Sequence, residues 1–152
     1  MAKQSAGILL YRKSQELEVL LVHPGGPFFA RKDLGSWSVP KGEYLNDEDP
    51  LDAAKREFEE ETGQKIDGDF ISLLPIKQSS GKIVTAWAVE GELDVETVVS
   101  NNFEMIWPPG SDKLRSFPEI DKAAWFSLET AKQKINKGQI PLLDQLADIV
   151  KV

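Results

Sequence analysis

Residues 42–63 constrain the fold of this chain of 152 residues more than any other stretch, because they contain a helix with clear start and stop signals. Asp49 is a favourable N-cap, and Pro50 follows it at the first helical position, where a missing N–H costs no hydrogen bond. Gly63 suits the left-handed conformation that ends many helices. The stretch therefore predicts a loop that leads into a helix over residues 50–62.

This helix should carry two neighbouring stripes of side chains, one apolar and one acidic. At about 100° of rotation per residue, the apolar stripe is Leu51, Ala54 and Phe58, and the acidic stripe is Glu57, Glu60 and Glu61. An acidic stripe is compatible with an ordinary solvated helix face. Here, however, it borders the apolar stripe that should pack on the core, so the carboxylates are expected to lie against the body of the protein.

Carboxylates that crowd one another favour a divalent cation. Glu57 and Glu61 repel each other at i, i+4, and Arg56 at i, i+4 from Glu60 offsets part of the repulsion. Oxygen-rich sites suit hard cations such as Mg²⁺, which proteins commonly share with substrate phosphates. A net charge of −7 argues against a nucleic-acid polymer as partner. A small phosphate-bearing substrate remains compatible, since the metal supplies positive charge.

Seven positions in this stretch match the Nudix box, the signature of the Nudix hydrolase family. They are Gly42, Glu48, Arg56, Glu57, Glu60, Glu61 and Gly63. One departure is Gln64, where the family usually has an aliphatic residue, and we expect Ile66 to supply that apolar contact. The resemblance implies an α+β fold, a Nudix-type mixed β-sheet sandwich flanked by α-helices. In outline the chain resembles bacterial nucleoside triphosphate pyrophosphohydrolases.

The resemblance also implies roles for the acidic residues in hydrolysis of a phosphoanhydride bond. Glu60 and Glu61 are implied as direct ligands of Mg²⁺, with Mn²⁺ as a substitute. Glu57 is implied to bond to a ligand or to metal-bound water, and so belongs to both the metal-binding and the catalytic residues. Arg56 is implied to orient these carboxylates. The carbonyl of Lys41 is expected to complete the metal shell.

Three box residues are assigned structural roles. Gly42 allows a tight turn after Lys41, and the side chain of Lys41 is also a candidate phosphate contact. Glu48 is expected to help hold the loop or the metal. Gly63 ends the helix.

A further base often comes from a later loop in this family, at a position that varies. Between residues 108 and 121 the acidic candidates are Asp112, Glu119 and Asp121, and we favour Glu119 because it directly precedes the predicted last strand. The alternative for each is an ordinary solvated loop residue.

Substrate recognition is assigned to residues 27–33, where two aromatic residues stand beside two basic ones. Phe28 is a candidate for stacking on a base, and Arg31 and Lys32 are candidates for phosphate contacts. The alternative is a strand end that packs Phe28 or Phe29 into the core. The adjacent Gly25 and Gly26 are weak evidence for a phosphate cradle, and the single histidine, at position 23, is assigned no catalytic role.

Residues 1–152 are expected to form a single domain, with these elements around the box. Strands are expected at 6–12 and 17–23, which form a hairpin, and at 36–40, 70–76, 82–89, 105–107 and 123–126. A long loop is expected at 108–118, and helices at 128–136 and 142–151, interrupted by Gly138 and Pro141.

The composition restricts the compartment, the partners and the class of protein. There is no cysteine, no long apolar run and no signal-peptide layout at residues 1–5, which predicts a cytoplasmic protein without a membrane partner. A nucleoside triphosphate and a diadenosine polyphosphate both fit as substrates, and the sequence does not fix monomer or dimer. A catalytically silent nucleotide-sensing module is the alternative from another class. A structural Ca²⁺ site is disfavoured, because no twelve-residue loop has alternating Asp or Asn ligands.

Overall fold

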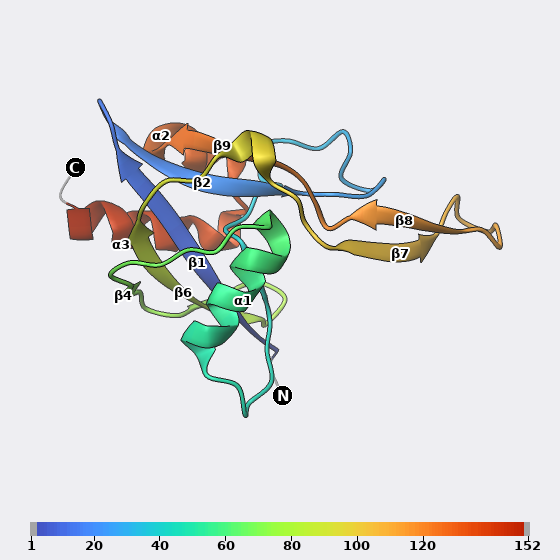
Figure 1. Cartoon of the computed structure of the whole chain (residues 1–152), viewed down its shortest axis with the longest axis horizontal. Coiled ribbons are helices and arrows are strands. Elements are labelled where there is room, and N and C mark those ends of the chain that lie inside the picture. Colours follow the sequence, from blue (N-terminus) through green and yellow to red (C-terminus); the bar gives the residue numbers. More distant parts are fainter. Residues whose placement is uncertain (1–2, 151–152) are drawn as a thin grey trace.

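A seven-stranded mixed β-sheet forms the centre of the computed structural model, which describes residues 3–150 (Figure 1). Its strands are β1 (Gln4–Lys13), β2 (Leu17–Pro24), β3 (Lys41–Glu43), β4 (Ile71–Ser72), β5 (Ile76–Lys77), β6 (Ile83–Glu90) and β9 (Ile120–Ser127). The main order is β4–β6–β1–β2–β9, with β3 paired to β1 and β5 paired to β6. The β1–β6 pair is parallel and the others are antiparallel, which gives the mixed sheet that the sequence predicted.

Helices cover both faces of this sheet. They are α1 (Pro50–Thr62), α2 (Leu128–Lys134) and α3 (Ile140–Val150), with short 3₁₀ helices at Val95–Thr97 and Lys137–Gln139. Ile8 and Leu10 of β1 pack on the α1 side, whereas Leu9 and Tyr11 pack on the side of α2 and α3. A strand buried on both faces has a continuous apolar run, as β1 has over residues 6–11. In the described part of the chain, no helix has both the length and the apolar character needed to cross a membrane.

The segment 37–43 lies between β1 and β2 and leads into the site. The Ile8 N–H donates to the Pro40 carbonyl at 3.1 Å, and Val22 and Ser38 exchange backbone hydrogen bonds of 2.9 Å. Gly7 permits this close approach, because a Cβ there would lie 2.7 Å from the Pro40 carbonyl oxygen. This segment therefore carries Lys41 and Gly42 beneath α1.

A second, two-stranded sheet projects from the body as an arm, formed by β7 (Asn102–Ile106) and β8 (Leu114–Pro118) (Figure 1). The prediction of a loop throughout 108–118 is therefore wrong. Residues 114–118 pair with β7 in antiparallel register, from Leu114 opposite Ile106 to Pro118 opposite Asn102. Their sequence, LRSFP, has little apolar alternation, so the pairing comes from the partner strand and not from local pattern.

Other elements differ from prediction in extent. Residues 36–40 form only isolated bridges at Trp37 and Ser38, and regular pairing begins at β3. The predicted strand 70–76 is split into β4 and β5, with Pro75 between them. The last helix begins at Ile140 and accommodates Pro141 in its first turn, where the missing N–H is tolerated. Lys151, the end of that predicted helix, lies outside the described residues.

Candidate active site

Helix α1 begins and ends where the sequence predicted. The Asp49 side chain accepts a hydrogen bond from the Asp52 backbone N–H at 3.1 Å, which caps the first turn. Gly63 adopts φ 76°, and its N–H donates to the Glu59 carbonyl at 2.7 Å. Phe58 is fully buried, whereas Glu59 is exposed. The acidic stripe therefore lies where the predicted rotation of the helix places it, with Glu61 reaching into the protein.

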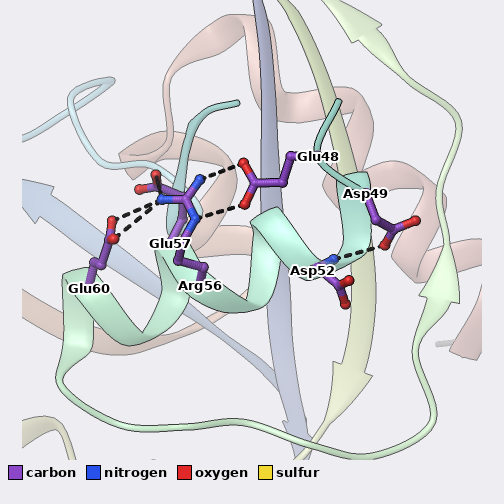
Figure 2. A network of polar contacts seen from close by, with 6 residues as sticks. All are labelled: Glu48, Asp49, Asp52, Arg56, Glu57 and Glu60. Atoms are coloured by element: carbon purple, nitrogen blue, oxygen red, sulfur yellow. Dashed lines mark hydrogen bonds and ion pairs between the residues drawn. The ribbon is translucent and has the colours of Figure 1, made fainter. Parts of the chain in front are cut away.

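Arg56 is the centre of a hydrogen-bond network on this helix (Figure 2). Its Nε and Nη2 donate to both carboxylate oxygens of Glu48, at 2.9 and 3.0 Å. Its Nη1 donates to Glu57 at 2.8 Å and to Glu60 at 3.3 Å. The hydrogen bonds to Glu48 help to raise the pKa of Arg56 and lower the pKa of Glu48. Glu48 thus anchors the guanidinium, which in turn orients two members of the acidic stripe.

Gly42 makes room for the Glu57 carboxylate. A Cβ built on Gly42 would lie 2.1 Å from Glu57 Cδ and from Oε2, distances that no real contact reaches. Burial, followed by the negative charge of Glu60, raises the pKa of Glu57, while Arg56 acts in the opposite direction. The turn at position 42 therefore serves the site by leaving space as well as by bending the chain.

Glu61 lies in a pocket of about 200 Å³ at the end of the sheet. The lining residues are Val22, Pro24, Ser38, Val39, Lys41, Glu61, Glu119 and Ile120. Burial, followed by the charge of Glu57, raises the pKa of Glu61 to about 8. Burial, followed by the nearby Lys82, lowers the pKa of Lys41. The pocket therefore holds an acid and a base that are both poorly solvated.

Of the three acidic candidates for a loop base, Glu119 is the one that lines this pocket. Its backbone is fixed on both sides, since its N–H donates to the Asn101 carbonyl at 2.9 Å and its carbonyl accepts from Gly25 at 2.8 Å. Burial, followed by the charge of Glu60, raises the pKa of Glu119. Asp112 lies between β7 and β8 at the end of the arm, and Asp121 is hydrogen-bonded to His23.

The predicted substrate loop is exposed, and its aromatic rings do not enter the core. Phe28 is 58% exposed and Phe29 is 37% exposed, so the alternative of core packing is wrong. Phe28 contacts Trp107 at the end of β7 edge to face, with ring centroids 5.5 Å apart. The Lys32 Nζ lies 5.2 Å from the centre of the Phe29 ring, and Arg31 is exposed. The loop thus presents aromatic and basic groups together, next to the arm.

The two adjacent glycines before this loop are packing contacts and not an open cradle. A Cβ on Gly25 would lie 2.1 Å from the Pro118 carbonyl oxygen. Gly26, with φ +94°, would place a Cβ 2.8 Å from the ring of Phe103. The start of the loop is therefore pressed against the base of the arm.

The donor set suits a hard cation, although the side chains are not drawn together around one point. Within residues 3–150, no three His, Cys, Asp or Glu side chains are arranged to hold a metal ion. Arg56 instead draws Glu57 and Glu60 toward itself through hydrogen bonds. Buried carboxylates with raised pKa values are nevertheless the groups that a divalent cation stabilises, and Gly42 keeps space free for one of them.

Sequence reasoning missed part of the pocket wall and the aromatic partner of the loop. Val22 and Ser38 meet through a bridge between segments that no local pattern connects. Trp107 directly follows β7 and contacts the Phe28 ring, which lies far away in the sequence, so no local pattern indicates that it borders the substrate loop.

Comparisons with known proteins agree with this architecture. A family model described as the NUDIX domain matches residues 1–146. A search of the curated proteins found no match. Among solved structures, the chain is similar to the Ap4A hydrolase of C. elegans in a binary complex, at 23% identity and a TM-score of 0.64, over 99% of this chain and 98% of that one.

Two further structures share the fold. One is the NUDIX domain of Shewanella oneidensis NrtR complexed with ADP ribose, with 15% identity, a TM-score of 0.65, and coverage of 99% and 89%. The other is a mutT/nudix family protein from Listeria innocua, with 17% identity, a TM-score of 0.66, and coverage of 98% and 94%. Because the family model spans almost the whole chain, the protein belongs to the Nudix hydrolase family, whose enzymes act on acid anhydrides in phosphorus-containing compounds.

Proposed function

We propose that the protein uses Mg²⁺ to hydrolyse a phosphoanhydride bond in a nucleoside diphosphate linked to another group. The observation that carries the proposal is the pocket where Glu61 and Glu119 face Lys41, next to a loop that exposes Phe28. Acidic groups provide the ligands for a metal, and the exposed ring provides a surface for a base. Nucleoside triphosphates are the first substrates proposed, with pyrophosphate as the expected product.

Each residue of the site has a place in this reaction. Glu60 and Glu61, with the carbonyl of Lys41, would hold the metal. When bound, Mg²⁺ neutralises charge on the phosphate oxygens and acidifies water. Arg56 sets the orientation of Glu57 and Glu60 through hydrogen bonds, and Glu48 holds Arg56 in place.

Proton transfer is assigned to Glu119. Its pKa is raised, so the carboxylate is a better proton acceptor than an ordinary glutamate. It lines the same pocket as Lys41, whose ammonium would contact a phosphate oxygen. Phe28 would stack on the base, and Arg31 and Lys32 would contact the outer phosphates.

A second substrate, diadenosine polyphosphate, is favoured by the similarity to the Ap4A hydrolase of C. elegans over nearly the full length of both chains. The edge-to-face pair of Phe28 and Trp107 lies at the end of the arm. Along β7, four residues of rise separate its two ends by about 13 Å. A substrate with several phosphates between its base and the cleaved bond suits that separation.

The test is a panel of nucleotides and dinucleotides incubated with the protein and Mg²⁺, with products identified by mass spectrometry. A nucleoside triphosphate pyrophosphohydrolase yields a nucleoside monophosphate and pyrophosphate. Cleavage of diadenosine tetraphosphate into a mononucleotide pair would establish the second substrate instead. The proposal fails if no nucleoside diphosphate derivative in the panel is cleaved under conditions where the protein is folded.

A further inference from the structure

His23 is buried and makes a hydrogen bond through each of its ring nitrogens. The ring is 1% exposed, and it is the single histidine in the chain. Its Nδ1 lies 2.7 Å from an Asp121 carboxylate oxygen, and its Nε2 lies 2.7 Å from the Lys32 carbonyl oxygen. The ring is therefore held between two different segments of the chain.

The two acceptors belong to the two parts of the site that must be held relative to each other. Lys32 lies in the substrate loop, four residues after Phe28. Asp121 lies in β9, two residues after Glu119, whose backbone already accepts a hydrogen bond from Gly25. His23 itself ends the regular part of β2, whose pairing with β9 becomes irregular directly after it. One buried ring thus links the loop to the strand that carries the loop base.

We propose that His23 is a positioning residue that fixes the substrate loop relative to the acidic pocket through its hydrogen bonds to Lys32 and Asp121. The inference rests on the proposed function, because it assigns the loop to substrate binding. His23 does not line the pocket, so it acts through these two partners. Its contribution should fall mainly on substrate binding, because β2 and β9 are already paired through their backbones and the bond to Lys32 is the one that reaches the loop.

Other contacts hold the same end of the loop. Hydrogen bonds from Lys134 and Trp37 lower the pKa of Asp33, the residue after Lys32. The Trp37 ring packs edge to face against His23, with centroids 5.2 Å apart. Asp33 and Lys134 tie the end of the loop to α2. The carbonyl of residue 32, which His23 holds, comes directly before this tie.

A matched pair of variants separates the two hydrogen bonds. In His23→Gln the amide nitrogen occupies the place of Nε2, so the bond to the Lys32 carbonyl is kept and the bond to Asp121 is lost. In His23→Asn the shorter amide reaches Asp121 but not Lys32. His23→Asn loses one methylene more of buried volume than His23→Gln and should melt at the lower temperature of the two, so KM is compared at a temperature where both are folded. We expect KM for the nucleotide to rise about tenfold or more in His23→Asn, the size of one buried hydrogen bond lost, and to change less than about threefold in His23→Gln.

Nuclear magnetic resonance of protein labelled with ¹⁵N-histidine tests the geometry without any activity. The single histidine gives one pair of ring nitrogen signals, and we expect both nitrogens to show a hydrogen bond. Asp144→Asn, which removes an exposed ion pair to Lys132, is the control and should leave the ring signals, KM and kcat unchanged.

Several results would overturn the inference. One is a wild-type ring in which either nitrogen makes no hydrogen bond. Another is an equal KM in His23→Gln and His23→Asn, which would mean that the bond to the loop is unimportant. If the wild-type protein cleaves no nucleotide, the proposed function fails separately. Amide hydrogen exchange of residues 28–33 then decides the inference: faster exchange in His23→Asn than in His23→Gln supports it, and equal exchange refutes it.

Discussion

The two parts of the candidate site are built in different ways. The acidic part is carried by α1, a helix that is capped at both ends and packed on the core through Ala53, Ala54 and Phe58, which are fully buried. The recognition part is carried by a loop and by the β7–β8 arm, where Phe28 is largely exposed. Groups that perform chemistry need fixed geometry, whereas groups that recognise a substrate can vary on exposed segments. Substitutions in the packed acidic part and in the exposed recognition part should therefore have different effects.

The largest expected effect concerns the core beneath the helix. Phe58→Ala should lower the free energy of unfolding by about 3–5 kcal/mol, because the ring is fully buried and the substitution leaves a cavity. Phe28→Ala, the same substitution at an exposed position, should change it by less than about 0.5 kcal/mol. Urea unfolding of both variants makes the comparison. Equal losses of stability would mean that the two regions are equally packed.

The acidic stripe should control turnover. Glu60→Gln and Glu61→Gln should each lower kcat by more than about a hundredfold, because each removes a positioned charge at the reacting phosphate. Glu59→Gln, on the exposed face of the same turn, is the matched control and should leave kcat unchanged. Circular dichroism should show a native fold in all three. Near-native turnover by both site variants would contradict the assignment of the stripe.

The raised pKa of Glu61 predicts how stability depends on pH when no metal is added. In the folded protein this pKa is about 8, against an ordinary value of 4.5. Between these values the unfolded chain releases the proton and the folded protein retains it, so rising pH favours unfolding. Stability should therefore fall by a few kcal/mol from pH 5 to pH 8. Below pH 4.5 the contribution is fully present.

Thermal melts at intervals of pH measure this effect. Glu61→Gln should flatten the decline, whereas Glu59→Gln should retain it. Mg²⁺ should raise the melting temperature more at pH 8 than at pH 5, because a cation binds the ionised carboxylate. A decline of the same slope in Glu61→Gln would assign the effect to other groups.

The smallest effect is expected in the recognition part. Phe28→Ala and Trp107→Ala should raise KM for a nucleotide about fivefold or more, as expected when a base loses one aromatic stacking surface. Hydrolysis of inorganic tripolyphosphate, which has no base, is the control and should be unaffected. Steady-state kinetics with both substrates measures the difference. An equal loss on the two substrates would place the rings in phosphate binding or in folding.

The acidic part was predictable because its signals are local. Asp49, Pro50 and Gly63 define the helix within one short stretch, and rotation along it sorts its glutamates. Even there, the bidentate partner of Arg56 was missed, because Glu48 lies outside the helix, where helical spacing gives no information. The family, the fold class and the enzyme class all follow from this stretch. The family model and the similar solved structures confirm them.

The recognition part was less predictable because its contacts join distant segments. Trp107 meets Phe28 across 79 positions of sequence, and β8 exists only because β7 pairs with it. The two hydrogen bonds of His23 reach Asp121 and Lys32 in different elements. A single sequence contains no pattern that joins such residues, so a histidine of this kind looks ordinary until the chain is folded.

The contact between position 42 and Glu57 has a consequence for how relatives of this protein are judged. A methyl group on that glycine would collide with the glutamate and force it out of its place, although every acidic residue would still be present in the sequence. Such a chain would pass any inspection that counts carboxylates and yet be expected to turn over poorly. Inferring activity in a homologue therefore requires checking for a missing side chain as carefully as for the charged ones.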